Sequence, residues 1–167
     1  GEGRGAVTTT TMVPHNRGAF HPNRIKEYIR IPFLDGGRDT NGCDCWGLIR
    51  LILLRECQIE VPTYGDIPAK ELMRVQSAIQ SDKQSFTWAR VGENQEHPFD
   101  IVVMTGTMRA SGEGLMRSAL VHVGIVTSPR HMLHTEKGYG VMHCAFKGAG
   151  ASQVIKARVK EIYRYIG

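Results

Sequence analysis

The chain has 167 residues and a formal net charge of +5, and this length predicts one domain. Hydrophobic residues make up 41% of the sequence, enough for a core, yet no apolar run reaches the ~20 residues of a membrane span. The first residues lack the apolar stretch of a secretory signal peptide, so we expect neither a membrane span nor an export signal. The basic residues are scattered, which argues against a specific nucleic-acid partner and suits an anionic polymer such as the bacterial cell wall.

Residues 1–22 are predicted to be an N-terminal extension, either flexible or docked on a partner. Gly, Thr, Pro, His and Asn dominate this segment, and it has no hydrophobic periodicity. We therefore place a single domain at residues 23–167. It begins with a short helix over residues 23–28, which is followed by a turn-rich loop over residues 35–42.

A buried helix is predicted from Cys45 to Cys57. Asp44 precedes it in the N-cap position. Apolar residues occupy almost every side of this helix, as in a central element of a core, and only Arg50 and Arg55 mark a polar edge.

The second half of the chain has the period of two and the β-branched residues that are typical of strands. A second helix over residues 69–80 and a short strand or helix end over residues 86–91 come first. Five strands are then expected, over residues 100–104, 119–127, 131–136, 141–146 and 159–166. The Gly-, Ser- and Met-rich residues 105–118 are predicted to be a loop that covers a cleft or contacts a partner. Helices followed by an antiparallel meander predict an α+β domain.

Two histidines fall on one predicted hairpin. If the turn around residues 127–129 places Val126 opposite Arg130, then His122 lies directly opposite His134. Side chains opposed in this way have Cβ atoms ~4.5–5.5 Å apart. That separation suits a general base and the residue that orients it.

Cys45 is the candidate nucleophile. A thiol in the first turn of a helix faces unpaired backbone N–H groups and the positive end of the helix dipole, so we expect a lowered pKa and rapid alkylation. His122 would take the thiol proton and later protonate the leaving amine, while His134 would orient the ring of His122. Backbone N–H groups near the thiol would stabilise an oxyanion, with Asp44 and Trp46 as supporting residues.

Each of these residues also has a purely structural interpretation. A Cys before an apolar helix is more often buried and inert, and a His on a strand is more often a satisfied core or surface residue. Trp46 fits a core position or a wall beside the thiol, and Asp44 fits a helix cap. The joint occurrence of Cys45, His122 and His134 is what favours catalysis.

One candidate set of zinc ligands in the sequence is Cys43, Cys45, His143 and Cys144. Its spacings differ from the Cys-x₂₋₄-Cys pairs of structural zinc sites, so we expect no metal and no other cofactor. Without a secretory signal, a disulfide framework is not expected either.

Three segments resemble the NlpC/P60 family of cysteine peptidases. Residues 42–50 (GCDCWGLIR) resemble the family's Asp-Cys-Ser/Trp-Gly-Leu signature. Residues 122–126 (HVGIV) are similar to its His-Val-Gly-Ile strand, and residues 132–134 (MLH) to the segment with its third polar residue. Trp46 directly after the Cys is typical of the phage-tail branch, as are residues 32–39 (PFLDGGRD) upstream and residues 163–165 (YRY) near the end.

The resemblance implies a papain-like fold, with N-terminal helices and the Cys on a buried helix packed against an antiparallel sheet. It implies a cysteine peptidase that hydrolyses amide bonds in peptidoglycan stem peptides. It also implies that the protein is made in the host cytoplasm and is then carried at the tail tip of a phage or gene transfer agent. At the tail tip it would contact tail-tip and hub proteins. There it would open the cell wall for DNA passage.

Two other functions stay open on the sequence. The first is a structural tail-tip protein with a retained but blocked peptidase fold, which the extension and residues 105–118 favour. The second is another thiol acyl-transfer hydrolase, such as an amidase or thioesterase, because the substrate pocket of this fold lies in loops.

Overall fold

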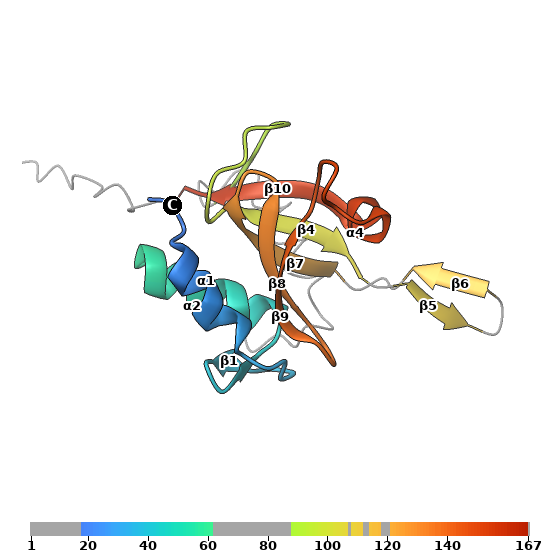
Figure 1. Cartoon of the computed structure of the whole chain (residues 1–167), viewed down its shortest axis with the longest axis horizontal. Coiled ribbons are helices and arrows are strands. Elements are labelled where there is room, and N and C mark those ends of the chain that lie inside the picture. Colours follow the sequence, from blue (N-terminus) through green and yellow to red (C-terminus); the bar gives the residue numbers. More distant parts are fainter. Residues whose placement is uncertain (1–17, 62–87, 107, 112–113, 118–120, 167) are drawn as a thin grey trace, which may run out of the picture.

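Two helices lie together on one side of a six-stranded antiparallel sheet (Figure 1). In this computed structural model, the described residues are 18–61, 88–106, 108–111, 114–117 and 121–166. The architecture is α+β, as the sequence predicts. The helix expected over residues 69–80 lies outside the described residues.

The helix α1 spans Pro22–Ile29, and the helix α2 spans Cys45–Cys57. The predicted bounds of α2 are confirmed, and α1 is one residue longer at each end than expected. The left-handed conformation of Gln58, with φ 54°, ends α2. Within the described part of the chain, no helix has the length and hydropathy that a membrane span needs.

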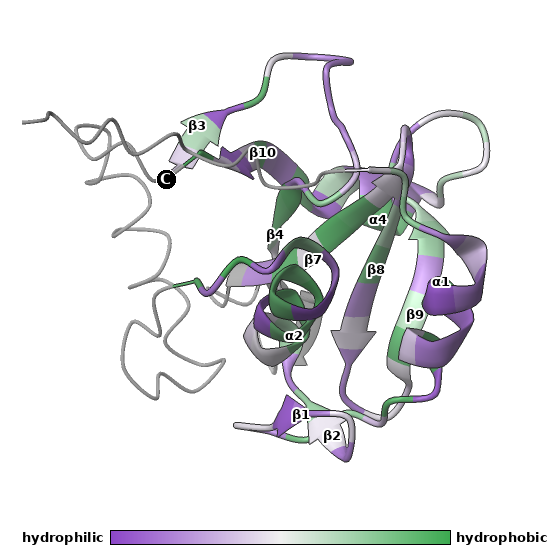
Figure 2. Cartoon of the chain, turned by 90° about the vertical axis from the view of Figure 1, so that its left-hand side faces the viewer, coloured by the Kyte–Doolittle hydropathy of each residue, from purple (hydrophilic) through white to green (hydrophobic). Residues whose placement is uncertain are grey.

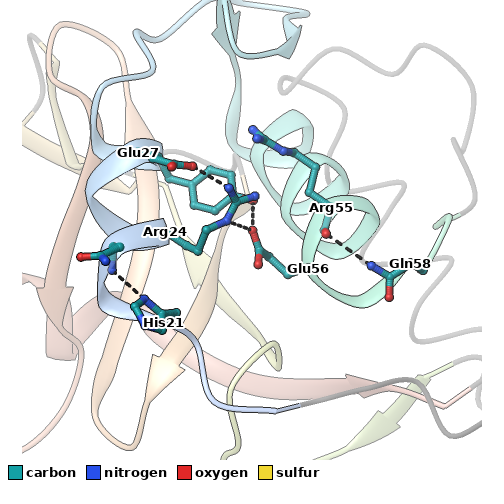
Figure 3. Close-up of polar contacts among 8 residues, drawn as sticks. His21, Arg24, Glu27, Arg55, Glu56 and Gln58 are labelled. Carbon is teal, nitrogen blue, oxygen red and sulfur yellow. Dashed lines mark hydrogen bonds and ion pairs between the residues drawn. The ribbon is translucent and has the colours of Figure 1, made fainter.

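Helix α1 is attached to the last turn of α2 by a polar cluster (Figure 3). The carboxylate of Glu56 accepts hydrogen bonds from Nε of Arg24 (2.8 Å) and from the hydroxyl of Tyr28 (2.6 Å). Tyr28 is buried, so its hydroxyl needs an acceptor inside the protein. This cluster fixes the position of α1 before the chain enters the loop that leads to α2.

Phe20 lies in the core, upstream of the boundary that the sequence places at residue 23. Its ring stacks on Phe99, with ring centroids 4.9 Å apart, and meets the ring of Tyr28 edge-on at 6.0 Å. Only 6% of Phe20 is exposed. The packing of Phe20 therefore moves the start of the folded unit to residue 20 or earlier.

A pair of deletions tests this boundary. Removal of residues 1–17 is expected to leave the free energy of unfolding nearly unchanged, because the described core contacts begin at Phe20. Removal of residues 1–22 also takes away the Phe20 ring and the first residue of α1, so we expect a loss of about 2–4 kcal/mol in the free energy of unfolding. Chemical denaturation of the two proteins checks this. Equal stabilities would contradict the role of Phe20.

Helix α2 packs its apolar side on β7 and β8 (Figure 2). Leu48, Ile49 and Ile52 are fully buried there, whereas Leu54 is half exposed. The first turn of the helix, with Cys45, lies against the sheet as well, because Cys45 belongs to the same core cluster as Val123.

The strand order in the large sheet is β3-β10-β4-β7-β8-β9. The last four strands follow one another as the predicted meander, whereas β10 returns between β3 and β4, which the sequence pattern did not predict. The strands are β3 (Trp88–Arg90), β4 (Ile101–Thr105), β7 (Val121–Ser128), β8 (His131–Glu136), β9 (Gly140–Ala145) and β10 (Val159–Tyr165).

Residues 105–118 do not form the expected loop. They contain a second small sheet, in which β5 (Met108–Ser111) pairs antiparallel with β6 (Gly114–Arg117). This hairpin projects beyond the ends of β4 and β7 (Figure 1). A role in covering a cleft or contacting a partner stays a prediction.

A short helix that the sequence did not predict, α4 (Gln153–Arg158), precedes β10. The hydroxyl of Ser152 caps it by accepting a hydrogen bond from the backbone N–H of Ile155 at 3.2 Å. Helix α4 places Arg158 beside the ends of β4 and β8, where it contacts Thr105 and Glu136.

The expected register of the β7–β8 hairpin is wrong by two residues. Val126 pairs with Met132 rather than with Arg130. The turn is tighter than predicted, because only Pro129 and Arg130 connect the strands, and the left-handed Arg130 (φ 79°) permits it. A β-bulge at residue 127 takes up the extra residue.

The register shift has a direct consequence for the histidines. Because the shift is two residues, His122 and His134 still share one face of the sheet. They are diagonal neighbours rather than directly opposed. Extending the pairing along the two strands places Glu136, not His134, opposite His122.

Candidate active site

Asp44 caps the helix that carries the candidate nucleophile. Its backbone is extended, and its Oδ1 accepts a hydrogen bond from the backbone N–H of Gly47 at 2.8 Å. The predicted N-cap is therefore confirmed. The carboxylate is fully buried, so it needs further partners.

The glycine-rich loop before α2 supplies those partners. Nη1 of Arg38 donates to Oδ1 of Asp44 at 2.6 Å, and the backbone N–H of Gly36 donates to Oδ2 at 3.1 Å. Two short strands, β1 (Arg38–Asp39) and β2 (Gly42–Cys43), hold the loop in place. Asp44 thus joins the loop to the first turn of α2.

Gly47 lets the loop and the helix touch. A Cβ atom at this position would lie 2.1 Å from the carbonyl oxygen of Gly37, far inside any allowed contact. The Asp-Cys-Trp-Gly segment therefore requires glycine for a steric reason. The contact fixes the position of the Cys45 backbone.

Cys45 is buried, with 3% of the residue exposed. Backbone groups of Val123, Trp46 and Cys45 itself lie close enough to the sulfur to lower its pKa. Val123 directly follows His122 on β7, so the thiol lies next to the strand that carries the candidate base. Among the described residues, no hydrogen bond joins this sulfur to an imidazole nitrogen. Trp46 is buried in the core.

The expected lowering of the Cys45 pKa is wrong. Burial, followed by the nearby carboxylate of Asp44, raises the pKa of this thiol to about 12. The nearby backbone groups lower the pKa of the thiol, but desolvation of the thiolate outweighs them. The helix terminus alone is therefore not enough to ionise a buried thiol.

The two candidate histidines are brought together. Nε2 of His122 lies 3.0 Å from Nδ1 of His134, with the rings edge to face. Both are buried, with 9% and 1% exposure. Burial and the positive charges of His134 and Arg158 hold the pKa of His122 well below 6.5. At neutral pH both the thiol of Cys45 and the imidazole of His122 are therefore neutral.

Glu136 and Arg158 complete the surroundings of the histidine pair. Oε1 of Glu136 is 3.8 Å from Nε2 of His122 and 3.9 Å from Nδ1 of His134. Arg158 donates to the same oxygen at 2.5 Å and to the backbone oxygen of Thr105 at 3.0 Å. Neither residue was predicted from the sequence. Glu136 could have been found, because it lies two residues after His134 on the same face of a strand.

The cysteine-containing zinc set does not assemble among the described residues. Nε2 of His143 instead lies 2.8 Å from the hydroxyl of Thr127. The cluster of metal-ligand types that the described residues form is His122, His134 and Glu136.

Alkylation is expected to be slow at Cys45, the reverse of the order that the sequence predicts. With a pKa near 12, about 10⁻⁵ of this thiol is ionised at pH 7, compared with about 3% for a free cysteine. Cys144, the least buried of the four thiols, should react first. Because the pKa is raised, the Cys45 rate should climb about tenfold per pH unit from pH 7 to 9.5. A timed iodoacetamide pulse with peptide mass spectrometry checks this, and denatured protein, in which all four cysteines should react alike, is the control.

Comparison with known proteins supports the fold. Neither a family model nor a curated protein matches the sequence. A solved protein from Staphylococcus aureus, described as similar to lipoprotein, NLP/P60 family, aligns with 91% of this chain at a TM-score of 0.50 and 17% identity. The aligned part is 44% of that protein, so this chain spans less than half its length. The NlpC/p60 domain of the peptidoglycan hydrolase SagA aligns over 74% of this chain and 84% of its own length, at a TM-score of 0.44 and 19% identity.

The chain thus has the papain-like α+β fold of NlpC/P60 domains, with the Cys on a buried helix that packs on an antiparallel sheet. This part of the sequence interpretation is confirmed.

Proposed function

We propose that the chain is a cysteine peptidase of the NlpC/P60 family that cleaves amide bonds of peptidoglycan stem peptides. One observation carries the proposal. The thiol of Cys45 sits at the capped N-terminus of α2, against the strand of His122, and His122 is hydrogen-bonded to His134. This arrangement supports the proposal, because acyl transfer by a thiol uses a nucleophile, a base and a residue that orients the base.

The proposed reaction starts from the neutral pair. His122 uses Nε2 toward His134, which leaves Nδ1 to take the thiol proton as the sulfur attacks the carbonyl carbon of the substrate. The C–N bond then breaks, and the imidazolium returns its proton to the leaving amine. Water hydrolyses the thioester with His122 as base, which releases the acid and restores the thiol. Backbone N–H groups at Cys45 and Trp46 are the proposed donors to the oxyanion.

We further propose that the chain acts at the tail tip of a phage or gene transfer agent. Its support is the sequence pattern, with Trp46 after the Cys and the Gly-Gly-Arg-Asp loop upstream. The positive charge of the chain also suits an anionic wall. In this proposal the virion carries the peptidase, and tail-tip and hub proteins hold it.

A second candidate rests on the burial of the thiol. With 3% exposure, Cys45 does not meet solvent directly, and this favours a structural tail-tip protein with a blocked site. An amidase or thioesterase on the same machinery is a third candidate, because it would use the same Cys and His residues.

Digestion of purified sacculi separates these candidates. The products are analysed as muropeptides by mass spectrometry, with Cys45→Ala as the inactive variant and Cys57→Ala as the control thiol, about 18 Å away along α2. The proposal expects shortened stem peptides with new amino termini from the wild type and from Cys57→Ala. Intact stem peptides from a folded wild-type protein would favour the structural candidate.

A further inference from the structure

Three potential metal ligands on β7 and β8 lie close together. Nε2 of His122 and Nδ1 of His134 are 3.0 Å apart, and Oε1 of Glu136 lies 3.8 and 3.9 Å from them. The point equidistant from these three atoms is about 2.1 Å from each, which is the bond length that zinc makes with imidazole nitrogen and carboxylate oxygen.

We propose that His122, His134 and Glu136 form a binding site for one zinc ion, with the fourth position open to water. Two imidazoles and one carboxylate are donors that zinc prefers, whereas magnesium and calcium favour oxygen-only sets. The site contains no cysteine, so it differs from the zinc set considered in the sequence. It also departs from the expectation that the chain binds no metal.

The ligands are held by their surroundings before a metal arrives. His134 is almost fully buried, and Glu136 is fixed by Arg158, which is itself anchored to the backbone of Thr105. Such outer contacts orient metal ligands. About a fifth of the Glu136 side chain is exposed, which gives an ion a path from solvent.

The positive charge of Arg158 is expected to weaken zinc binding. Its guanidinium contacts Oε1 of Glu136 and would lie close to the bound cation. Glu136 has a second oxygen through which it can keep the ion pair while Oε1 binds zinc. The repulsion still weakens the site, so Arg158→Gln is expected to raise the zinc affinity while Glu136→Gln lowers it.

Zinc occupancy would take Nε2 of His122 away from its contact with His134. This consequence rests on the proposed function: zinc would then inhibit hydrolysis reversibly, and EDTA would restore it. Binding of the ion itself does not depend on that function.

Zinc titration of the full chain against a chromophoric chelator tests the site. We expect one ion per chain, at least tenfold weaker binding in His134→Gln and Glu136→Gln, and unchanged binding in Cys45→Ala. Circular dichroism verifies that each variant is folded. Cobalt substitution of the wild type gives a second readout, which needs no variant: a nitrogen and oxygen site shows no thiolate-to-metal charge-transfer band.

Loss of binding in Cys45→Ala, a thiolate band or no binding to the wild type would each overturn the zinc site. None of these results affects the peptidase proposal, which depends on sacculus digestion. Conversely, stoichiometric zinc binding by a chain that does not cut sacculi even after EDTA has removed the zinc would overturn the peptidase and leave the metal site standing.

Discussion

Replacement of His122 by alanine is expected to reduce the rate of peptidoglycan hydrolysis about 10²–10⁴-fold, the usual contribution of a general acid–base residue. The effect should fall near the upper end, because the raised pKa of Cys45 leaves almost no thiolate without a base. His134→Gln should cost less, since the amide can still orient the imidazole. Initial rates of muropeptide release measure both.

The matched control is His143→Ala. His143 lies on the neighbouring strand β9 and contacts Thr127 rather than the histidine pair. Its loss should leave the rate within about twofold of wild type. If His143→Ala and His122→Ala lost activity equally while both stayed folded, the assignment of His122 as the base would be wrong.

Replacement of Gly47 by alanine is expected to have the largest effect on stability, on the order of 4 kcal/mol or more. A Cβ atom there would meet the carbonyl oxygen of Gly37 at 2.1 Å. Neither side can yield easily, because a helix and a hydrogen-bonded loop meet backbone to backbone. The loop contacts to Asp44 and the position of the Cys45 thiol should be lost together.

Gly150→Ala is the control, because it makes the same glycine-to-alanine change at a position with room for the added Cβ atom. Its added Cβ would meet Ala145 at 3.8 Å, an ordinary contact, so we expect a change within about 0.5 kcal/mol. Urea denaturation compares the two variants. A Gly47→Ala protein as stable as wild type would show that the loop and helix can separate at low cost.

The sequence predicted the elements that local signals define. Helix α2 was placed correctly, because a capping Asp44 and a continuous apolar run define it, and β8 was placed correctly within the strand-rich second half of the chain. The β7–β8 register was missed, because the bulge at residue 127 and the left-handed Arg130 have no distinctive sequence signal. Strand β10 returns to β4 through long-range pairing that periodicity cannot reveal.

The same distinction between local signals and long-range contacts applies to the candidate site. Cys45, His122 and His134 could be identified from the motif and its spacing, and the structure brings the two histidines into contact. The contribution of Arg158 depends on a short helix near the C-terminus, far from the histidines in sequence. The raised pKa of Cys45 depends on burial against β7. A local pattern contains neither kind of information.

In the proposed reaction Cys45 attacks the substrate and carries its acyl group. The most direct measurement is intact-protein mass spectrometry of wild-type protein that is acid-quenched during turnover of a soluble stem peptide. Peptide mapping then locates any adduct. We expect an added mass equal to the acyl half of the substrate on Cys45, labile to hydroxylamine, with no adduct and no hydrolysis in Cys45→Ala. Hydrolysis at the wild-type rate by folded Cys45→Ala, or an acyl adduct on a different residue, would contradict it.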